Sequence, residues 1–205
     1  MSLAAQYDKF SNTWASMLER HGFSRAYRGL FDRVRFNVRN KSVCDVGTGS
    51  GDFALALANS RGRLQSLTLV DPSLSMLDVA VNRLSPMCND LSAYPCRLED
   101  LLRHQSFDVV LAAHVLEHCL DPQDGLASLF RLLKPGGILV LSVSKPHICQ
   151  WLIWLRWRHR WFGEAQMKAM LSSAGFAVSC CYAYPEGIPE RVSRAYVVQR
   201  PIESL

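Results

Sequence analysis

Three closely spaced glycines are the strongest chemical signal in the chain. Gly47, Gly49 and Gly51 follow the short apolar run Val43–Val46, and a helical pattern begins at Asp52. Glycine lets the chain turn tightly and lets backbone N–H groups approach a ligand closely. The segment therefore predicts a ligand-binding turn between a strand and a helix. A glycine-rich turn that binds nothing is the alternative.

The spacing of these glycines differs from that of the dinucleotide-binding fingerprint. That fingerprint, G-x-G-x-x-G, would place its third glycine one residue later than Gly51. An acidic residue, Asp45, also lies two positions before the first glycine. Both features argue against NAD and FAD as the ligand.

A second carboxylate follows the next predicted strand. Asp71 comes directly after Leu67–Val70 and lies 20 residues after Gly51. A carboxylate at this place can accept hydrogen bonds from both hydroxyls of a ribose. The alternative is that Asp71 caps the following helix, although Ser73 is the better candidate for that cap.

The elements that must position these residues alternate along the chain. Residues 3–41 are expected to form two helices, because apolar side chains recur there at steps of three and four. The predicted strands after them are residues 42–46, 67–70, 92–97, 107–112, 138–143, 176–183 and 196–199. The predicted helices are residues 52–60, 73–84, 123–133 and 164–174.

This alternation of strands and helices predicts a mostly parallel sheet covered on both faces. Such sheets bind ligands at the carboxyl ends of their strands. The segment Lys134–Gly137 is expected to end the helix before it. The last two strands have little between them, which suggests an antiparallel pair.

The composition is that of a globular protein. The chain has 205 residues, of which 49% are hydrophobic and 20% charged, so wholesale disorder is excluded. It has no run of about 18 apolar residues and no secretory signal, so we expect a cytoplasmic protein. Seven cysteines without C-x-x-C spacing are expected to be reduced thiols.

The net charge of +5 is unevenly distributed. Residues 1–41 hold eight Lys or Arg against three Asp or Glu, and the rest of the chain is neutral. A nucleic acid could use the stripe of arginines in this segment. No RNA-binding module is evident, however, so a nucleic acid is not the expected partner.

Five segments, in this order and at these spacings, resemble the class I S-adenosylmethionine-dependent methyltransferases. They are residues 45–51 (DVGTGSG), 69–77 (LVDPSLSML), 98–101 (LEDL), 107–118 (FDVVLAAHVLEH) and 132–139 (LLKPGGIL). The similarity extends from about Val43 to Phe176. The most similar subgroup is the ubiquinone- and menaquinone-biosynthesis methyltransferases, in which the fourth strand likewise leads into a Leu-Glu-His sequence.

The resemblance implies an α/β fold of the Rossmann-like, doubly wound type, with a mostly parallel seven-stranded sheet and N-terminal helices. It also implies S-adenosylmethionine as the cofactor and S-adenosylhomocysteine as its product. Asp71 would bind the ribose hydroxyls of the cofactor. Its methionine part would be held by Asp45, Gly47, Thr48, Gly49 and Gly51.

The resemblance also implies the residues around the adenine. Pro72 and Met76 would flank the ring, and Leu98 and Glu99 would contact it. An aromatic side chain near Trp14 would help to cover the cofactor. Trp14 fits a plain core stripe of the first helix equally well.

His114, at the end of the fourth predicted strand, is the best-placed titratable residue for catalysis. Imidazole titrates near neutrality, which suits a general base that takes a proton from a methyl acceptor. Lining the pocket or bonding to the backbone is the alternative role. The residues from His114 to His118 also match the metal motif H-x-x-E-H. No third ligand stands out, so no metal site is predicted.

Residues 146–162 are rich in tryptophan and arginine, and the resemblance places substrate or lid elements in this region. On a helix, Trp154, Trp157 and Trp161 would fall on one side. Three interpretations stay open. The helix could pack its tryptophans over the substrate site, or the aromatic side chains could form a pocket for a lipophilic acceptor. Alternatively, the segment Trp151–Trp161 could lie on the inner face of an anionic membrane.

Taken together, these features predict a single methyltransferase domain over residues 1–205 that acts on a small-molecule acceptor. Methylation at oxygen or carbon is favoured over nitrogen, and a lipophilic acceptor suits the tryptophan-rich segment. The rival function is that of a catalytically silent S-adenosylmethionine-binding partner or scaffold. The expected parts are a helical segment (1–41), a cofactor-binding core (42–145), a substrate or lid insertion (146–162) and a C-terminal helix with antiparallel strands (163–205).

Overall fold

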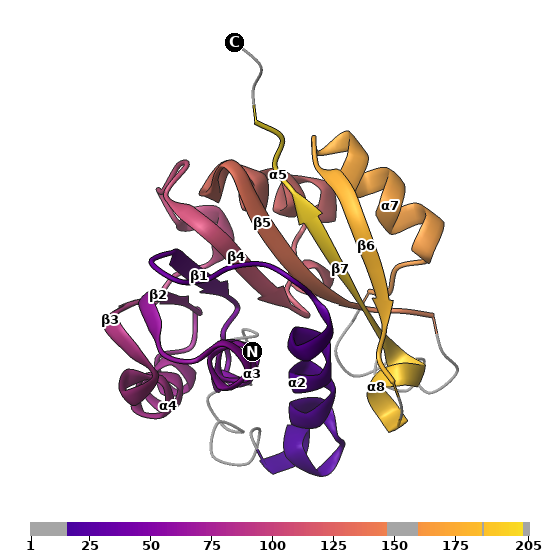
Figure 1. Cartoon of the computed structure of the whole chain (residues 1–205). Coiled ribbons are helices and arrows are strands. Elements are labelled where there is room, and N and C mark those ends of the chain that lie inside the picture. Colours follow the sequence, from indigo (N-terminus) through magenta and orange to yellow (C-terminus); the bar gives the residue numbers. More distant parts are fainter. Residues whose placement is uncertain (1–15, 147–159, 186, 203–205) are drawn as a thin grey trace.

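The computed structural model describes residues 16–146, 160–185 and 187–202. Helices pack on both faces of one seven-stranded sheet (Figure 1). The strands are β1 (Ser42–Val46), β2 (Leu64–Val70), β3 (Cys88–Tyr94), β4 (Phe107–Ala113), β5 (Leu133–Ser144), β6 (Ala177–Ala183) and β7 (Ser193–Gln199). The α-helices are α2 (Phe23–Arg33), α3 (Asp52–Arg61), α4 (Leu74–Leu84), α5 (Pro122–Leu132), α7 (Glu164–Ser173) and α8 (Gly187–Val192). Short 3-10 helices are η1 (Ser85–Met87), η2 (Leu98–Asp100) and η3 (Leu116–His118).

The strand order in the sheet is β3-β2-β1-β4-β5-β7-β6. The first five strands of the sequence pair in parallel, and β7 runs antiparallel between β5 and β6. Parallel neighbours require crossover connections, which α3, α4 and α5 supply. The predicted fold class is therefore confirmed, including the antiparallel pair at the end of the chain.

Each face of the sheet has its own apolar core. In β1, Val43 packs in the cluster that contains α2, α3 and α4, whereas Cys44 packs in the cluster that contains α5 and α7. Both side chains are fully buried. Successive side chains of a strand point to opposite faces, so a strand covered on both sides is apolar throughout. This double burial fixes β1 and with it the turn that follows.

Apart from the earlier starts of β2, β5 and β7, two predictions about the sheet are wrong. The third strand is predicted at residues 92–97, but β3 spans Cys88–Tyr94, because it pairs with β2 from Leu64 onward. β3 lies at the edge of the sheet, and Asn89 and Asp90 in its first half are polar and exposed, so it lacks the apolar pattern of a strand. The late strands were expected to have little between them, but α8 lies there.

The segment Lys134–Gly137 does follow the end of α5, as predicted, but it is not a loop. It belongs to β5, which begins at Leu133 opposite Phe107 of β4. Hydrogen bonds from Gly136 N–H to the Arg200 carbonyl, and from Arg200 N–H back to the Gly137 carbonyl, continue the pairing there. On the β4 side the segment bulges from the ladder, because Leu133 lies opposite Phe107 and Ile138 opposite Val109.

The N-terminal helices are confirmed in part. The second is α2, which packs along α3 with the rings of Phe31 and Phe53 5.0 Å apart. The structure describes only the last five residues of the first predicted helix, 16–20, and these are helical. In the described parts of the chain, every helix is too short or too polar to span a membrane.

The strand order has a switch point beside β1. The chain leaves β1 toward β2 and β3 on one side and later returns to place β4 on the other side. Ligands of such sheets bind at this switch point, outside the carboxyl ends of the strands. The glycine turn follows β1, Asp71 follows β2 and His114 follows β4, so these predicted site residues lie at this edge.

Candidate functional site

The turn after β1 has a backbone that only glycine adopts readily. Gly47, Gly49 and Gly51 have φ values of 62°, 51° and 83°, in the left-handed region. A Cβ atom on Gly47 would lie 2.5 Å from Val115 Cγ2, and one on Gly51 would lie 2.8 Å from Leu84 Cδ1. All three glycines are therefore favoured by backbone conformation, and Gly47 and Gly51 also by close packing.

The side chain of Asp45 lies beneath this turn and is 1% exposed. Its Oδ2 accepts a hydrogen bond of 2.8 Å from the Thr48 hydroxyl, and the Thr48 N–H donates to the Val70 carbonyl at 3.1 Å. Burial raises the pKa of Asp45 to about 7, against the opposing effect of its hydrogen bonds from Thr48 and from the Ala54 backbone. The charged groups that act on Asp45, Asp71 and Asp52, are themselves acidic and raise its pKa further.

Asp71 connects the glycine turn to α4. Its Oδ2 accepts the Gly49 N–H at 2.9 Å, and its Oδ1 accepts the Ser73 N–H at 2.9 Å. The helix cap is Ser73, whose hydroxyl accepts the Met76 N–H at 3.2 Å. Each carboxylate oxygen can accept two hydrogen bonds, so these bonds orient Asp71 and still permit it to bind a ribose.

His114 lies beside the ends of β4 and β5 and the start of β7. It has a φ of 58°, and its backbone N–H donates to the Ser142 carbonyl at 2.8 Å. Its Nδ1 lies 3.0 Å from Glu117 Oε1 and 3.2 Å from Ser144 Oγ, while Nε2 lies 3.4 Å from Ser193 Oγ. The side chain is 23% exposed. Both roles predicted for His114, in catalysis and in binding the backbone, are compatible with this geometry.

Glu117 holds the imidazole in one orientation. Its side chain is fully buried, and its Oε1 also accepts the Ser144 N–H at 2.6 Å. An ionised carboxylate can only accept a hydrogen bond, so with Glu117 ionised Nδ1 of His114 is the donor in this pair. In the neutral imidazole this leaves Nε2 as the nitrogen that can accept a proton.

A row of aromatic side chains begins at His114 and runs into the core beside α2. The Phe23 ring lies edge-on to the imidazole with the ring centroids 5.9 Å apart, and Tyr27 lies 5.8 Å from Phe23. Tyr184 lies 6.0 Å from Tyr27, and its hydroxyl donates to the Ser142 hydroxyl at 2.8 Å. Burial raises the pKa of both tyrosines, so they remain neutral. One edge of the imidazole therefore faces the Phe23 ring, whereas its two nitrogens face polar side chains.

Comparison with known proteins identifies the family. The family described as "Methyltransferase domain" matches residues 14–180, which is more than half of the chain. This chain belongs to the class I S-adenosylmethionine-dependent methyltransferases. The family predicted from the sequence is thus confirmed, and S-adenosylmethionine is the cofactor that this membership supports.

Two relatives show how far the similarity to this methyltransferase extends. The ubiquinone/menaquinone biosynthesis C-methyltransferase of Geotalea daltonii is 29% identical over 151 residues, covering 71% of this chain and 61% of the relative. The ubiquinone biosynthesis O-methyltransferase of Coxiella burnetii is 36% identical over 110 residues, covering 53% and 45%. The chain thus spans about half of the length of these curated relatives.

Solved structures share the fold of this methyltransferase. The N-methyltransferase NodS from Bradyrhizobium japonicum, in complex with S-adenosyl-L-homocysteine, matches with a TM-score of 0.76. It is 18% identical, and the match covers 98% of this chain and 100% of that one. A Haloferax volcanii protein described as a putative methyltransferase in complex with the Trm112 activator matches with a TM-score of 0.75 at 21% identity, covering 95% and 97%.

The residues of the methyltransferase fit the chemistry of its cofactor. The methionine end of S-adenosylmethionine carries an ammonium group, and Asp45 is a buried carboxylate whose charged neighbours are acidic. A cation bound nearby would stabilise its ionised form. The ribose of the cofactor carries a diol, and Asp71 presents a carboxylate at the end of β2. The turn between them contains three glycines with positive φ values, a backbone conformation that glycine adopts readily.

The predicted adenine-binding residues lie on the β2–β3 side of the turn. Met76 and Leu98 are almost fully buried, at 1% and 6% exposed, whereas Pro72 and Glu99 are exposed. Glu99 lies against the thiol of Cys119, whose pKa is raised to about 12 by burial and by this carboxylate. The four side chains follow the carboxyl ends of β2 and β3, where the resemblance places the adenine. Trp14 lies outside the described residues.

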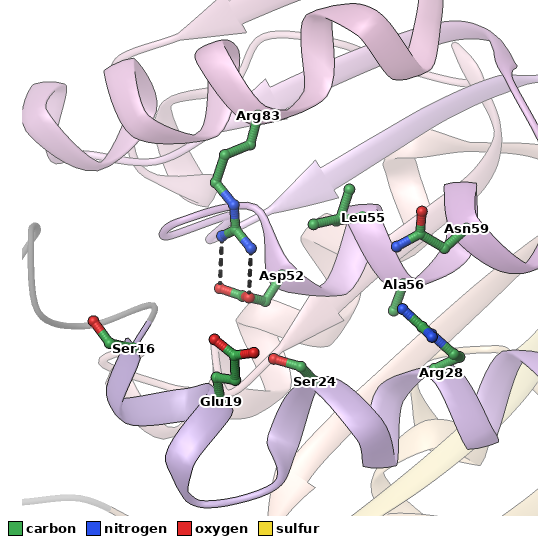
Figure 2. Close-up of a pocket in the computed structure, with 9 residues that line it drawn as sticks. All are labelled: Ser16, Glu19, Ser24, Arg28, Asp52, Leu55, Ala56, Asn59 and Arg83. Atoms are coloured by element: carbon green, nitrogen blue, oxygen red, sulfur yellow. Dashed lines mark hydrogen bonds and ion pairs between the residues drawn. The ribbon is translucent and has the colours of Figure 1, made fainter.

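Several residues of the methyltransferase site were not singled out from the sequence. Ser144 and Ser193 contact His114 from β5 and β7, and no local pattern marks them. The spacing of three between His114 and Glu117 is a signal in the sequence, but it also fits the metal motif H-x-x-E-H. Arg83 was also missed, although it pairs with Asp52 beside the glycine turn (Figure 2).

Proposed function

We propose that this protein transfers the methyl group of S-adenosylmethionine to oxygen or carbon of a small, lipophilic acceptor. The proposal is carried by the position of the glycine turn, Asp71 and His114, which follow the adjacent strands β1, β2 and β4 at one edge of the sheet. When bound, the cofactor supplies an electrophilic methyl group on its sulfonium. The protein must bind it, align the acceptor and exclude water.

The proposed binding roles follow the chemistry of each group. Asp45, with Thr48 and the three glycines of the turn, would bind the methionine part, and Asp71 the ribose. Pro72, Met76, Leu98 and Glu99 would enclose the adenine, together with Trp14. The residues of the turn that would bind the methionine part are Gly47, Thr48, Gly49 and Gly51.

His114 would act as the general base. A hydroxyl or acidic carbon of the acceptor would lose its proton to Nε2 as its bond to the methyl carbon forms. The buried carboxylate of Glu117, 3.0 Å from Nδ1, would stabilise the imidazolium that results. S-adenosylmethionine would supply the methyl group, and its sulfur would keep the electron pair of the broken carbon–sulfur bond and leave as S-adenosylhomocysteine.

The aromatic side chain next to His114 supports a lipophilic acceptor. Phe23 contacts the imidazole and is only partly buried, whereas Tyr27 and Tyr184 lie behind it in the core. The names of the relatives in ubiquinone and menaquinone biosynthesis also support an acceptor of the quinone class, methylated at oxygen or carbon. Membrane contact through residues 151–161 would give access to such a molecule. Most of this segment lies outside the described residues, and Trp161 within it is 36% exposed.

The test is transfer of labelled methyl into cell extracts. The purified protein is incubated with methyl-labelled S-adenosylmethionine and either the lipid or the aqueous extract of a strain that lacks the gene. We expect label in the lipid extract, and fragmentation of the product by mass spectrometry distinguishes O-methyl from C-methyl. Tight binding of S-adenosylhomocysteine without any transfer would favour the silent scaffold instead. Label found only in the aqueous extract would support methyltransferase activity but contradict a lipophilic acceptor.

A further inference from the structure

The glycine turn is held by one residue just before α4 and by one residue in the last turn of α4. Before the first turn of α4, Asp71 accepts the Gly49 N–H. In the last turn of α4, Arg83 reaches back and donates from Nη1 to the Ser50 carbonyl at 2.5 Å. Between these two contacts, Gly51 packs directly against the helix, because a Cβ built on it would lie 3.3 Å from the backbone of Ala80.

Arg83 also makes a two-point ion pair with Asp52, the first residue of α3 (Figure 2). Nη2 lies 3.0 Å from Oδ1 and Nη1 lies 3.1 Å from Oδ2. Oδ2 accepts a further hydrogen bond of 2.5 Å from the Ser50 hydroxyl. Ser50 is therefore held by both partners of the pair, through its carbonyl and through its side chain.

Burial makes this pair stronger than an ordinary surface ion pair. The side chain of Asp52 is 6% exposed and that of Arg83 is 30% exposed. A partly buried pair is screened little by salt, and a planar guanidinium that bonds both oxygens fixes the carboxylate in one geometry. A lysine ammonium is a point charge and cannot bond both Asp52 oxygens and the Ser50 carbonyl in the same planar arrangement.

The glycine turn needs such an external restraint. Glycine loses more backbone freedom on folding than any other residue, and three of the five residues from Gly47 to Gly51 are glycines in the left-handed region. We propose that Arg83 is a positioning residue for the cofactor, because its bonds to Ser50 and Asp52 hold the turn in the shape that binds S-adenosylmethionine. The inference rests on the proposed function, since it assigns Arg83 to the same cofactor site.

The chain offers a matched control at the other end of α3. Arg61 also donates to backbone carbonyls, those of Phe31 and Val34, and so ties α3 to the end of α2. It is partly buried, like Arg83, but lies far from the glycine turn along the helix. Loss of Arg61 should therefore lower stability without a specific effect on the cofactor.

The test is calorimetric titration of S-adenosylhomocysteine into the full chain carrying Arg83→Met, Arg83→Lys, Asp52→Asn or Arg61→Met, with the melting temperature of each variant measured alongside. We expect Arg83→Met to raise Kd at least about tenfold, Arg83→Lys to restore part of the affinity, and Arg61→Met to stay within about twofold of wild type. Hydrogen exchange of residues 47–52 should rise in Arg83→Met. In the double variant of Arg83→Met and Asp52→Asn, Kd should rise no further than in Arg83→Met alone, because the two residues act as one unit.

Two results would overturn the inference. One is a folded Arg83→Met variant that binds within about twofold of wild type, since a positioning role predicts a much larger loss. The other is an Arg61→Met variant that loses as much affinity as Arg83→Met, since both effects would then follow from stability. If Arg83→Met does not fold, the Kd of Arg83→Lys is compared with that of wild type instead. A higher Kd supports the inference, and an equal Kd contradicts it. A wild-type chain that binds no S-adenosylhomocysteine would instead refute the proposed function.

Discussion

Asp45 makes cofactor binding depend on pH in a direction that the structure specifies. Burial raises the pKa of Asp45 to about 7 in the free protein, so its carboxyl group takes up a proton as the pH falls through neutrality. The ammonium group of the cofactor requires the ionised form. The ionised fraction falls from about nine-tenths at pH 8 to about one-tenth at pH 6, so the affinity for S-adenosylhomocysteine should weaken about tenfold.

Calorimetric titration at about pH 6, 7 and 8 measures this dependence. The control is Asp45→Asn, which keeps an oxygen that can accept the Thr48 hydroxyl but has no charge to titrate. Its affinity should be lower than that of wild type at pH 8 and nearly constant over the same range. A wild-type affinity that changes no more than that of Asp45→Asn would show that Asp45 does not bind the cationic end of the cofactor.

The same group links stability to pH. Because its pKa is raised in the folded state from the ordinary value of 3.8 to about 7, Asp45 stabilises the protein fully below pH 4. This contribution is lost as the pH rises from about 4 to about 7, and the loss amounts to roughly 4 kcal/mol at most. In urea unfolding without ligand, wild type should therefore lose more stability than Asp45→Asn between pH 5 and pH 8. Parallel losses in the two proteins would contradict the assignment.

Three further changes test the other parts of the site. Asp71→Ala should weaken binding of S-adenosylhomocysteine by about 1–3 kcal/mol, because buried polar partners lose their acceptor; unchanged affinity in calorimetry would place the ribose elsewhere. His114→Gln should lower kcat by roughly 10²–10⁴ while leaving cofactor affinity nearly unchanged; a kcat close to that of wild type would leave His114 a lining role only. In liposome flotation, anionic vesicles should retain wild type better than a double variant with Trp154→Ala and Trp157→Ala. Equal retention of both proteins, or of neither, would contradict membrane contact.

The cofactor turn could be predicted because its chemistry is local. Glycine spacing, the preceding acidic residue and the carboxylate after the next strand all occur within residues 45–71. The switch point of a parallel sheet then brings the strand ends together. The alternation of strands and helices is sufficient to predict that these strand ends meet, although the predicted range of β3, at the polar edge of the sheet, is wrong.

The partners of these residues could not be predicted because they depend on tertiary contacts. Ser193 lies 79 residues after His114 and reaches it only because β7 inserts antiparallel between β5 and β6. Arg83 looks like an ordinary charged residue in the last turn of a helix, where a cation favours the helix dipole. Its pairing with Asp52 depends on how α4 packs on α3, which no spacing in the sequence encodes.

Formation of S-adenosylhomocysteine in step with a methylated product is the most direct test of the central claim. The full chain is supplied with methyl-labelled S-adenosylmethionine and the lipid extract, and both products are quantified over time for wild type and for Asp71→Ala. The proposed function predicts equal amounts of S-adenosylhomocysteine and labelled lipid from wild type, and much slower formation of both from Asp71→Ala. No labelled product from a wild-type chain that binds the cofactor would contradict it.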